Sequence, residues 1–263
     1  MASPEFPGRV IKRGERDATT VRRIQRRLNA RGCGPIGVDG KFAGETEAGV
    51  KLFQARFPDA DGQPLVVDGK VGSITWQALF GEDSVPASDR APTPLLAKAI
   101  EIARSQIGIM EQPPGSNRGP EVDEYVRRAG LNPGGKFAWC AAFLYFCFDE
   151  AAIAGGRANP VIKTAGVLDH WERAGRKGVP RITGPKAVED PGLVQPGHIF
   201  IIDTGAPGGG GHTGLVVEVV GGKLVTIEGN TNDLGSAEGV GVFKRESRKI
   251  AQINKGFIDY SGA

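Results

Sequence analysis

The hydrophobic pattern of the chain changes type near Gly197, and this change restricts the fold more than any other feature of the sequence. Before this point apolar residues recur at helical spacing, and residues 137–153 form the most apolar helical candidate. After it, short apolar runs separated by turn residues indicate strands in HIFIID, HTGLVVEVV, KLVTIEGN, GVGVFK and GFIDY. Helices followed by strands predict an α+β fold with helices packed on an antiparallel β-sheet.

The N-terminal third contains an internal repeat, VDGKFAGET from Val38 and VDGKVGSIT from Val67. Each copy places a turn-forming Asp-Gly pair before a threonine that leads into an apolar-periodic stretch. Residues 74–80 predict a short third helix, and two longer helices are indicated by the apolar stripes Val21, Ile24, Leu28 and Val50, Phe53, Phe57. We therefore expect a small three-helix domain with one core.

A length of 263 residues suits two modest domains. Residues 82–94, EDSVPASDRAPTP, are rich in proline and small polar residues and show no periodicity, which is typical of a linker. The predicted organisation is an N-terminal tail over 1–13, a helical domain over 14–81, the linker over 82–94 and an α+β domain over 95–263.

Charge and composition exclude several classes of protein. The net charge of +3 is divided almost evenly along the chain and gives no electrostatic case for nucleic-acid binding. No apolar run approaches the roughly 20 residues that a membrane span requires. The first residues lack the apolar stretch of a secretory signal, so we expect synthesis in the cytoplasm without a visible signal peptide. We expect a monomer without membrane insertion and without a cofactor.

The cysteines Cys33, Cys140 and Cys147 show no metal-ligand spacing, and we expect no metal site. Cys140 and Cys147 are separated by about 10 Å along the predicted helix, which is too far for a disulfide. Cys140 lies in the first turn of this helix, where free backbone N–H groups and the helix dipole favour a thiolate and could stabilise an oxyanion. An ordinary core cysteine is the alternative, and the local context favours neither.

A thiolate nucleophile needs an imidazole as general base and acid. His212 opens a strand directly after the glycine-rich loop GAPGGGG and is the best candidate. His198 begins another strand, and His170 lies in a helical segment that we expect to be partly exposed; we interpret both as structural or solvated. Glu228 and Asn230 alternate in the strand that ends in IEGN and could orient the imidazole, although an acid there could equally cap a strand end.

Strand geometry makes this hypothesis testable. A simple two-residue turn at Gly221 and Gly222 would put Glu228 and Asn230 on the face opposite His212, because neighbours in a strand alternate. We therefore predict an odd-length loop, or a bulge between His212 and Asn230, with one of the two acceptors hydrogen-bonded to the His212 ring. The Cys140 sulfur should lie close to the other ring nitrogen.

Residues 95–260 resemble a CHAP domain, the cysteine, histidine-dependent amidohydrolase/peptidase fold related to papain-like peptidases. FAWCAAF around Cys140, PGHIF, GHTGLVVEV at His212 and IEGN carry the likeness. The resemblance implies that Cys140 is the nucleophile, His212 the base and acid, Glu228 the residue that orients His212, and Asn230 a polar helper. His198 departs from the aspartate that such domains more often carry in a Pro-Gly-Asp turn, which we expect to alter the turn and not the chemistry.

The aromatic residues next to Cys140 have two interpretations. Phe137 and Trp139 could line a substrate groove, whereas a place in the core is at least as compatible with an aromatic beside a buried helix.

Residues 14–81 resemble the three-helix peptidoglycan-binding domain of wall hydrolases, through VRRIQRRL, VDGKFAGETEAGVKLFQ and VDGKVGSITWQAL. The pairing implies a hydrolase of peptidoglycan that acts on the bacterial cell wall as an N-acetylmuramoyl-L-alanine amidase or as an endopeptidase. A phage endolysin is the simplest biological setting, beside a secreted autolysin or a delivered effector. A non-catalytic wall-binding protein, an intracellular papain-like peptidase and a transglutaminase-like acyl transferase are the alternatives.

One face of the first helix carries Arg22, Arg23, Arg26 and Arg27 opposite its apolar stripe. These arginines could attract anionic wall polymers, but a solvated charged face is the more common reason for such a pattern.

Overall fold

The computed structural model describes residues 3–81, 84–135, 137–206, 210–232 and 239–263. The chain divides into two compact units. The first comprises Met1–Ala87, Val188–Gly192 and Val220–Gly222, and the second comprises Ser88–Ala187, Leu193–Val219 and Lys223–Ala263. Among the described residues, no helix is both long and apolar enough to cross a membrane.

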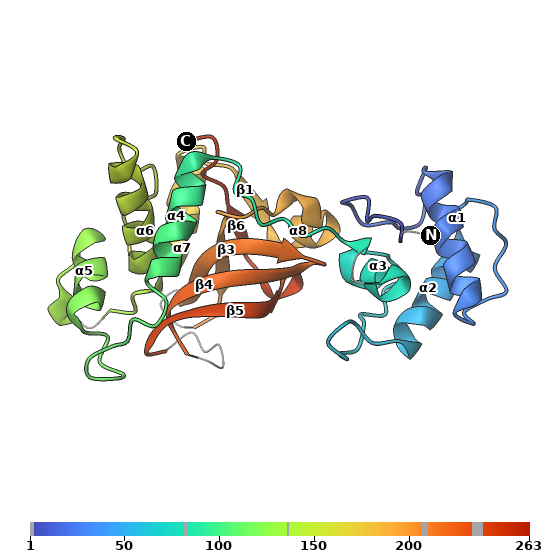
Figure 1. Cartoon of the computed structure of the whole chain (residues 1–263), viewed down its shortest axis with the longest axis horizontal. Helices are drawn as coiled ribbons and strands as arrows, with labels where there is room; N and C mark the ends of the chain where they lie inside the picture. Colours follow the sequence, from blue (N-terminus) through green and yellow to red (C-terminus); the bar gives the residue numbers. More distant parts are fainter. Residues whose placement is uncertain (1–2, 82–83, 136, 207–209, 233–238) are drawn as a thin grey trace. The chain divides into compact units, whose positions relative to one another are not determined.

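The first unit contains the three predicted helices, α1 (Ala18–Ala30), α2 (Gly44–Arg56) and α3 (Ser73–Phe80) (Figure 1). Asp17 caps α1 by accepting hydrogen bonds from the backbone N–H groups of the first turn. The helices enclose one core, and the predicted stripes supply it together with α3: Val21, Ile24, Leu28, Val50, Phe53, Trp76 and Leu79 are all fully buried.

The internal repeat is also a repeat of hydrogen bonds. In the first copy, the buried side chain of Gln25 donates to Asp39 Oδ1 at 2.8 Å and accepts from the backbone N–H of Gly40 at 2.9 Å. In the second copy, the same two bonds at 3.0 and 2.9 Å join Gln54 to Asp68 and Gly69. Each Asp-Gly turn is thus fixed to the helix before it, because a buried amide must satisfy both its donor and its acceptor.

The second unit begins with helices, as predicted. They are α4 (Pro94–Ser105), α5 (Pro120–Arg128), α6 (Cys140–Ala154), α7 (Val167–Arg176) and α8 (Gly184–Glu189), with short 3₁₀ turns at Pro133–Gly135, Pro191–Leu193 and Ile250–Gln252. Helix α6 contacts α4, α5 and strand β4, and α7 contacts β2. Most of α6 is buried, so this helix lies at the centre of the core.

Six antiparallel strands follow in the order β1-β6-β2-β3-β4-β5. They are β1 (Arg181–Thr183), β2 (Ile199–Asp203), β3 (Gly211–Val220), β4 (Lys223–Thr231), β5 (Gly241–Lys249) and β6 (Gly256–Ile258). The predicted α+β fold with helices on an antiparallel sheet is confirmed. The sequence pattern did not indicate α8 or β1, which have only six and three residues.

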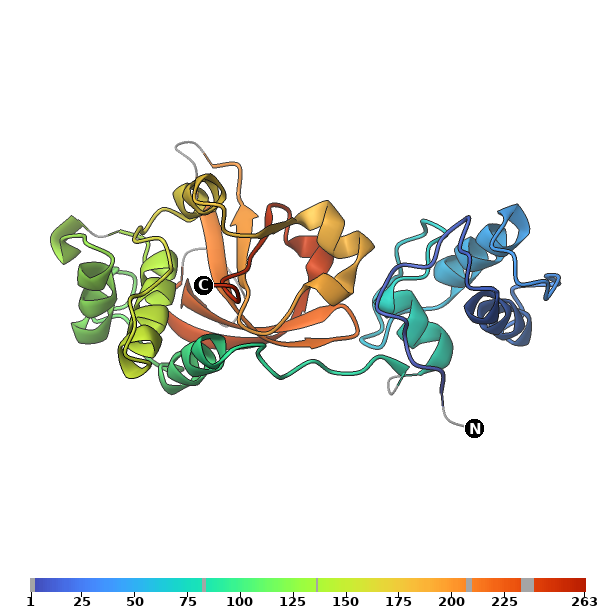
Figure 2. The same ribbon diagram turned by 90° about the horizontal axis from the view of Figure 1, so that it is seen from above.

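The sheet carries a hydrophobic core on each face. Ile199 and Ile201 of β2 belong to the large core formed with α4 to α7, whereas Phe200 between them joins a smaller core with Ala187 of α8. Figure 2 shows α6 and α8 on opposite sides of the curved sheet. Alternation along β2 therefore separates the two cores, as expected for a strand buried on both faces.

Candidate active site

Cys140 is the first residue of α6 and is 2% exposed. The N-cap residue Trp139 makes no side-chain hydrogen bond to this helix, so the first backbone N–H groups have no capping acceptor from that side chain. Trp139, the residue before Cys140, is fully buried and donates its indole N–H to Glu111 Oε1 at 2.8 Å. Trp139 is therefore a core residue that holds the start of α6, which is the second of the two interpretations of its position.

His212 lies at the start of β3, where it pairs with Ile202 of β2 and is 2% exposed. Its Nε2 is 2.7 Å from Glu228 Oε2. The predicted hydrogen bond between the His212 ring and an acceptor of β4 is confirmed. Its Nδ1 is buried and has no hydrogen bond of ordinary geometry within the described part of the chain.

The hairpin between β3 and β4 keeps the two-residue turn, with φ of 59° at Gly221 and 82° at Gly222. The odd-length loop is therefore wrong. His212 and Glu228 nevertheless share a face, since a Cβ at Gly214, two residues after His212, would lie 2.7 Å from Glu228 Cγ. A two-residue turn and a shared face are compatible only if one strand carries an extra residue between the turn and this pair, so the bulge alternative holds.

Two glycines make room for this arrangement. Gly214 leaves space for the Glu228 side chain, as the short distance to a hypothetical Cβ shows. A Cβ at Gly229 would lie 2.8 Å from atoms of Phe143 and Trp139, so the absence of a side chain lets β4 approach the start of α6. Both glycines stand in the motifs that contain His212 and Glu228, but their packing role was not visible in the sequence pattern.

The pKa of His212 reports on its neighbours. Burial disfavours the imidazolium, but the Cys140 thiol and the Glu228 carboxylate more than reverse this effect and raise the pKa of His212 from 6.5 to about 9. Cys140 is therefore near enough to act on the ring, although within the described residues no hydrogen bond joins its sulfur to the buried Nδ1. Burial also opposes ionisation of Glu228, yet hydrogen bonds from His212 and Arg248 bring its pKa from 4.5 to about 2. Cysteine hydrolysis uses an imidazolium that pairs with a thiolate and is stabilised by a carboxylate.

Asn230 does not follow the simple alternation predicted for it. It has a φ of 54° and lies where the pairing of β4 with β5 shifts register between Glu228 and Thr231. Its Oδ1 is buried without a hydrogen-bond partner in the described part of the chain. A left-handed backbone and an unsatisfied buried acceptor both cost free energy, and such features concentrate at functional sites.

Phe137 is 42% exposed, in contrast to Trp139. Its aromatic side chain is therefore available to a ligand near the start of α6, and its place in a substrate groove stays a prediction.

The other histidines and cysteines are structural in their surroundings. His170 is 2% exposed and lies 2.9 Å from the Tyr260 hydroxyl, so the expectation of partial exposure is wrong; helix α7 turns this face into the core. His198 Nε2 lies 3.4 Å from Asp259 Oδ1. Cys147 is fully buried, and burial raises the pKa of its thiol well above the ordinary value. All three cysteines are free.

Several contributors to the site were missed at the level of sequence. Glu111, which holds Trp139, also accepts from the backbone N–H of Asn117 at 3.1 Å. Thr226 Oγ1 donates to Glu228 Oε1 at 2.6 Å, and Arg248 binds both oxygens of the same carboxylate. Among the described residues, no cluster of three or more His, Cys, Asp or Glu side chains could hold a metal ion.

Comparison with protein families assigns both parts of the chain. The PG_binding_1 family, a peptidoglycan binding domain, matches residues 17–79, and the CHAP domain family matches residues 132–230. The first match spans α1 to α3, and the second contains Cys140, His212, Glu228 and Asn230. Searches of curated proteins and of solved structures found no match.

Proposed function

We propose that the protein cleaves an amide bond in the peptide part of peptidoglycan with Cys140 as nucleophile. The proposal starts from the two domains of the chain, because a PG_binding_1 peptidoglycan-binding domain joined to a CHAP amidohydrolase/peptidase domain makes a cell-wall hydrolase in general terms. The contact that supports this proposal is the 2.7 Å hydrogen bond between His212 and Glu228, and Cys140 is among the groups that raise the pKa of His212.

The reaction has two halves. The Cys140 thiolate attacks the carbonyl carbon, and N–H groups at the start of α6 stabilise the oxyanion that forms. As the C–N bond breaks, the His212 imidazolium gives its proton to the leaving nitrogen and a thioester remains. His212 then takes a proton from water as the water oxygen attacks the thioester carbon. The C–S bond breaks, Cys140 becomes a thiolate again beside the His212 imidazolium, and the product leaves as a carboxylic acid that ionises in solvent. Glu228 stabilises the imidazolium throughout.

Mass spectrometry of digested cell walls tests this proposal. We expect new amine and carboxyl ends at a single type of amide bond, and none with Cys140→Ala protein. A new end between muramic acid and L-alanine would identify an amidase, and an end between two amino acids would identify an endopeptidase. If the muropeptides stay intact after incubation with the wild-type protein, the proposed hydrolysis is refuted and wall binding is the function that remains.

The two-module layout supports an endolysin as the biological setting. Expression in the cytoplasm of a susceptible host should then cause lysis only when a membrane pore is supplied. Lysis without a pore would point instead to export of the protein, as for an autolysin or an effector.

A further inference from the structure

Glu228 has more partners than the orientation of an imidazole requires. Arg248 donates from Nε to Oε1 at 2.8 Å and from Nη2 to Oε2 at 2.7 Å, so that its guanidinium binds the carboxylate as a fork. Thr226 donates to Oε1 at 2.6 Å, and Arg245 Nε lies 3.4 Å from Oε2. Glu228 itself is fully buried, so each of these contacts acts away from solvent.

An irregularity in the sheet brings both arginines to this carboxylate. Leu224 pairs with Arg248 and Thr226 pairs with Arg245, so β5 carries one extra residue across this step. Side chains three positions apart face opposite sides of a regular strand, but a bulge between them places both on one side.

We propose that Arg248, assisted by Arg245, is a positioning residue that keeps Glu228 ionised and directed at His212. This inference rests on the proposed function. A carboxyl group buried alone would take up a proton and become a hydrogen-bond donor, and it could then no longer stabilise an imidazolium. The planar fork of Arg248 fixes both carboxylate oxygens and leaves Oε2 facing the ring. The lowered pKa of Glu228 agrees with this role.

The charged and titratable groups around this carboxylate are few. Within the described residues they are His212 of β3, with Cys140 of α6 beyond it, and Arg245 and Arg248 of β5. Loss of Arg248 should raise the pKa of Glu228, because a favourable neighbour of its charged form is removed. A Glu228 that is less charged should in turn lower the pKa of His212.

The test is Arg248→Met. In the wild-type protein the guanidinium carbon of Arg248 lies 4.9 Å from the centre of the Phe200 ring, and methionine keeps an unbranched side chain over this ring. We expect kcat on a soluble muropeptide to fall about 10- to 100-fold, as for other groups that orient a catalytic residue from behind. The pH profile should narrow from both ends, with the acidic limb moving up and the alkaline limb moving down. Arg248→Lys should recover part of the loss, because it keeps the charge but not the fork.

The matched control is Arg128→Met, which removes an arginine that binds Glu124, Asp149 and Glu150 on the helices of the same unit. It should lower thermal stability without moving either limb. NMR titration of His212 gives a second readout that does not need activity. A failure of the proposed hydrolysis can therefore be told apart from a failure of the proposed role of Arg248. An unchanged His212 pKa in folded Arg248→Met protein would overturn the proposal. If Arg248→Met does not fold, the same titration is made on Arg245→Met and Arg248→Lys, which should both lower the pKa of His212. An unchanged His212 pKa in both variants would overturn the proposal.

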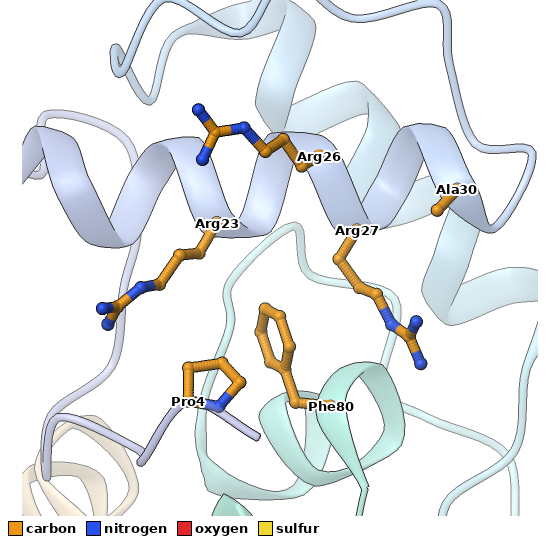
Figure 3. Close-up of a pocket in the computed structure, with 6 residues that line it drawn as sticks. All are labelled: Pro4, Arg23, Arg26, Arg27, Ala30 and Phe80. Atoms are coloured by element: carbon orange, nitrogen blue, oxygen red, sulfur yellow. The ribbon is translucent and has the colours of Figure 1, made fainter. Parts of the chain in front are cut away.

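A second, independent observation concerns the peptidoglycan-binding unit. A groove of about 410 Å³ is lined by one face of α1, by Phe80 of α3 and by Pro4. Figure 3 shows the ring of Phe80 between the side chains of Arg23 and Arg27, with Pro4 below and Arg26 higher on the helix. Among the described residues, no carboxylate lies within ion-pair distance of these arginines.

From this groove we infer a subsite for the peptide stems of peptidoglycan, which also rests on the proposed function. Stems carry free carboxylates on short alkyl chains. The groove offers the guanidinium groups of Arg23 and Arg26 beside an apolar floor of Phe80 and Pro4, while Arg27 donates to the Leu79 carbonyl. Arginines at i, i+3 and i+4 repel one another in the free protein, so a bound anion would relieve the repulsion.

Sedimentation with insoluble peptidoglycan tests this subsite in protein inactivated by Cys140→Ala. We expect Arg23→Ala with Arg26→Ala to weaken binding about tenfold, the effect of losing one charge-assisted hydrogen bond. The control, Arg16→Ala with Lys41→Ala, removes the same charge from exposed positions outside the groove. Removal of stems from the wall should abolish the difference between the two variants. Equal binding of both variants, or binding that depends on wall phosphate instead of stems, would overturn this assignment. In the active protein, neither pair of substitutions should change the hydrolysis of soluble muropeptides, so this result is independent of the proposed activity.

Discussion

At the scale of single residues, the two cysteines of α6 differ in the groups that surround them. Cys140 begins the helix beside His212, whereas Cys147 lies inside it with no exposed surface. We predict that Cys140→Ala lowers hydrolysis by roughly 10⁴-fold or more with little change in melting temperature. Cys147→Ser should keep kcat but lose about 1 to 3 kcal/mol of stability, because it buries a hydroxyl in an apolar core. Thermal melts and a dye-release assay on cell walls measure both, and full activity of Cys140→Ala would refute the nucleophile.

The charge of His212 makes stability depend on pH. Its pKa is about 9 in the folded protein, against an ordinary value of 6.5, so the folded state holds this proton more tightly than the unfolded chain. The resulting stability is fully present below pH 6.5 and is lost as the pH rises through about 9. We predict that the melting temperature declines over this range, and that the decline is much weaker in His212→Gln. The same slope in both proteins would contradict an imidazolium at this site.

Local sequence signals indicated the residues proposed to react but not those that hold them. Cys140 at a helix start and Glu228 at a strand end can be recognised from neighbours in the sequence. Arg248 cannot be recognised in this way, because its approach to Glu228 depends on a bulge that no turn residue in the sequence indicates. His170 was expected to be partly exposed, but the side of α7 that contains it packs into the core.

At the scale of elements, the site depends on how closely β4 approaches α6. Gly229 stands at this contact, and a Cβ there would lie 2.8 Å from atoms of Phe143 and Trp139. We predict that Gly229→Ala costs about 1 to 3 kcal/mol of stability through overpacking. A displacement of about 1 Å between Cys140 and His212 would lower kcat by roughly 10²-fold. Gly262→Ala is the control, since a Cβ there would meet nothing within 4 Å. Wild-type kcat in Gly229→Ala would show that this contact does not set the geometry.

Periodicity was sufficient to predict the longer elements, because α6 and the long strands bury apolar residues, but not the short elements α8 and β1. Register was less accessible. The turn at Gly221 and Gly222 is the simple one, yet His212 and Glu228 share a face through a bulge within the strands. The sequence could show that the proposed chemistry required one of two irregularities, but only the structure distinguishes a loop from a bulge.

At the scale of the whole molecule, the question is whether the wall-binding unit acts only by attachment. The N-terminal segment of the first unit ends at Ala87, in the linker predicted over 82–94, and α4 to α7 and the six strands lie after it in the sequence. Removal of residues 1–90 should therefore leave hydrolysis of soluble muropeptides nearly unchanged. On intact walls, attachment raises the effective concentration of substrate, so its loss should lower the rate on the order of 10²-fold. Both rates can be measured on the same preparation after circular dichroism has verified folding. An equal loss on soluble and insoluble substrates would mean that the first unit supports the active site itself, and a fragment that does not fold would mean that the domain boundary lies elsewhere.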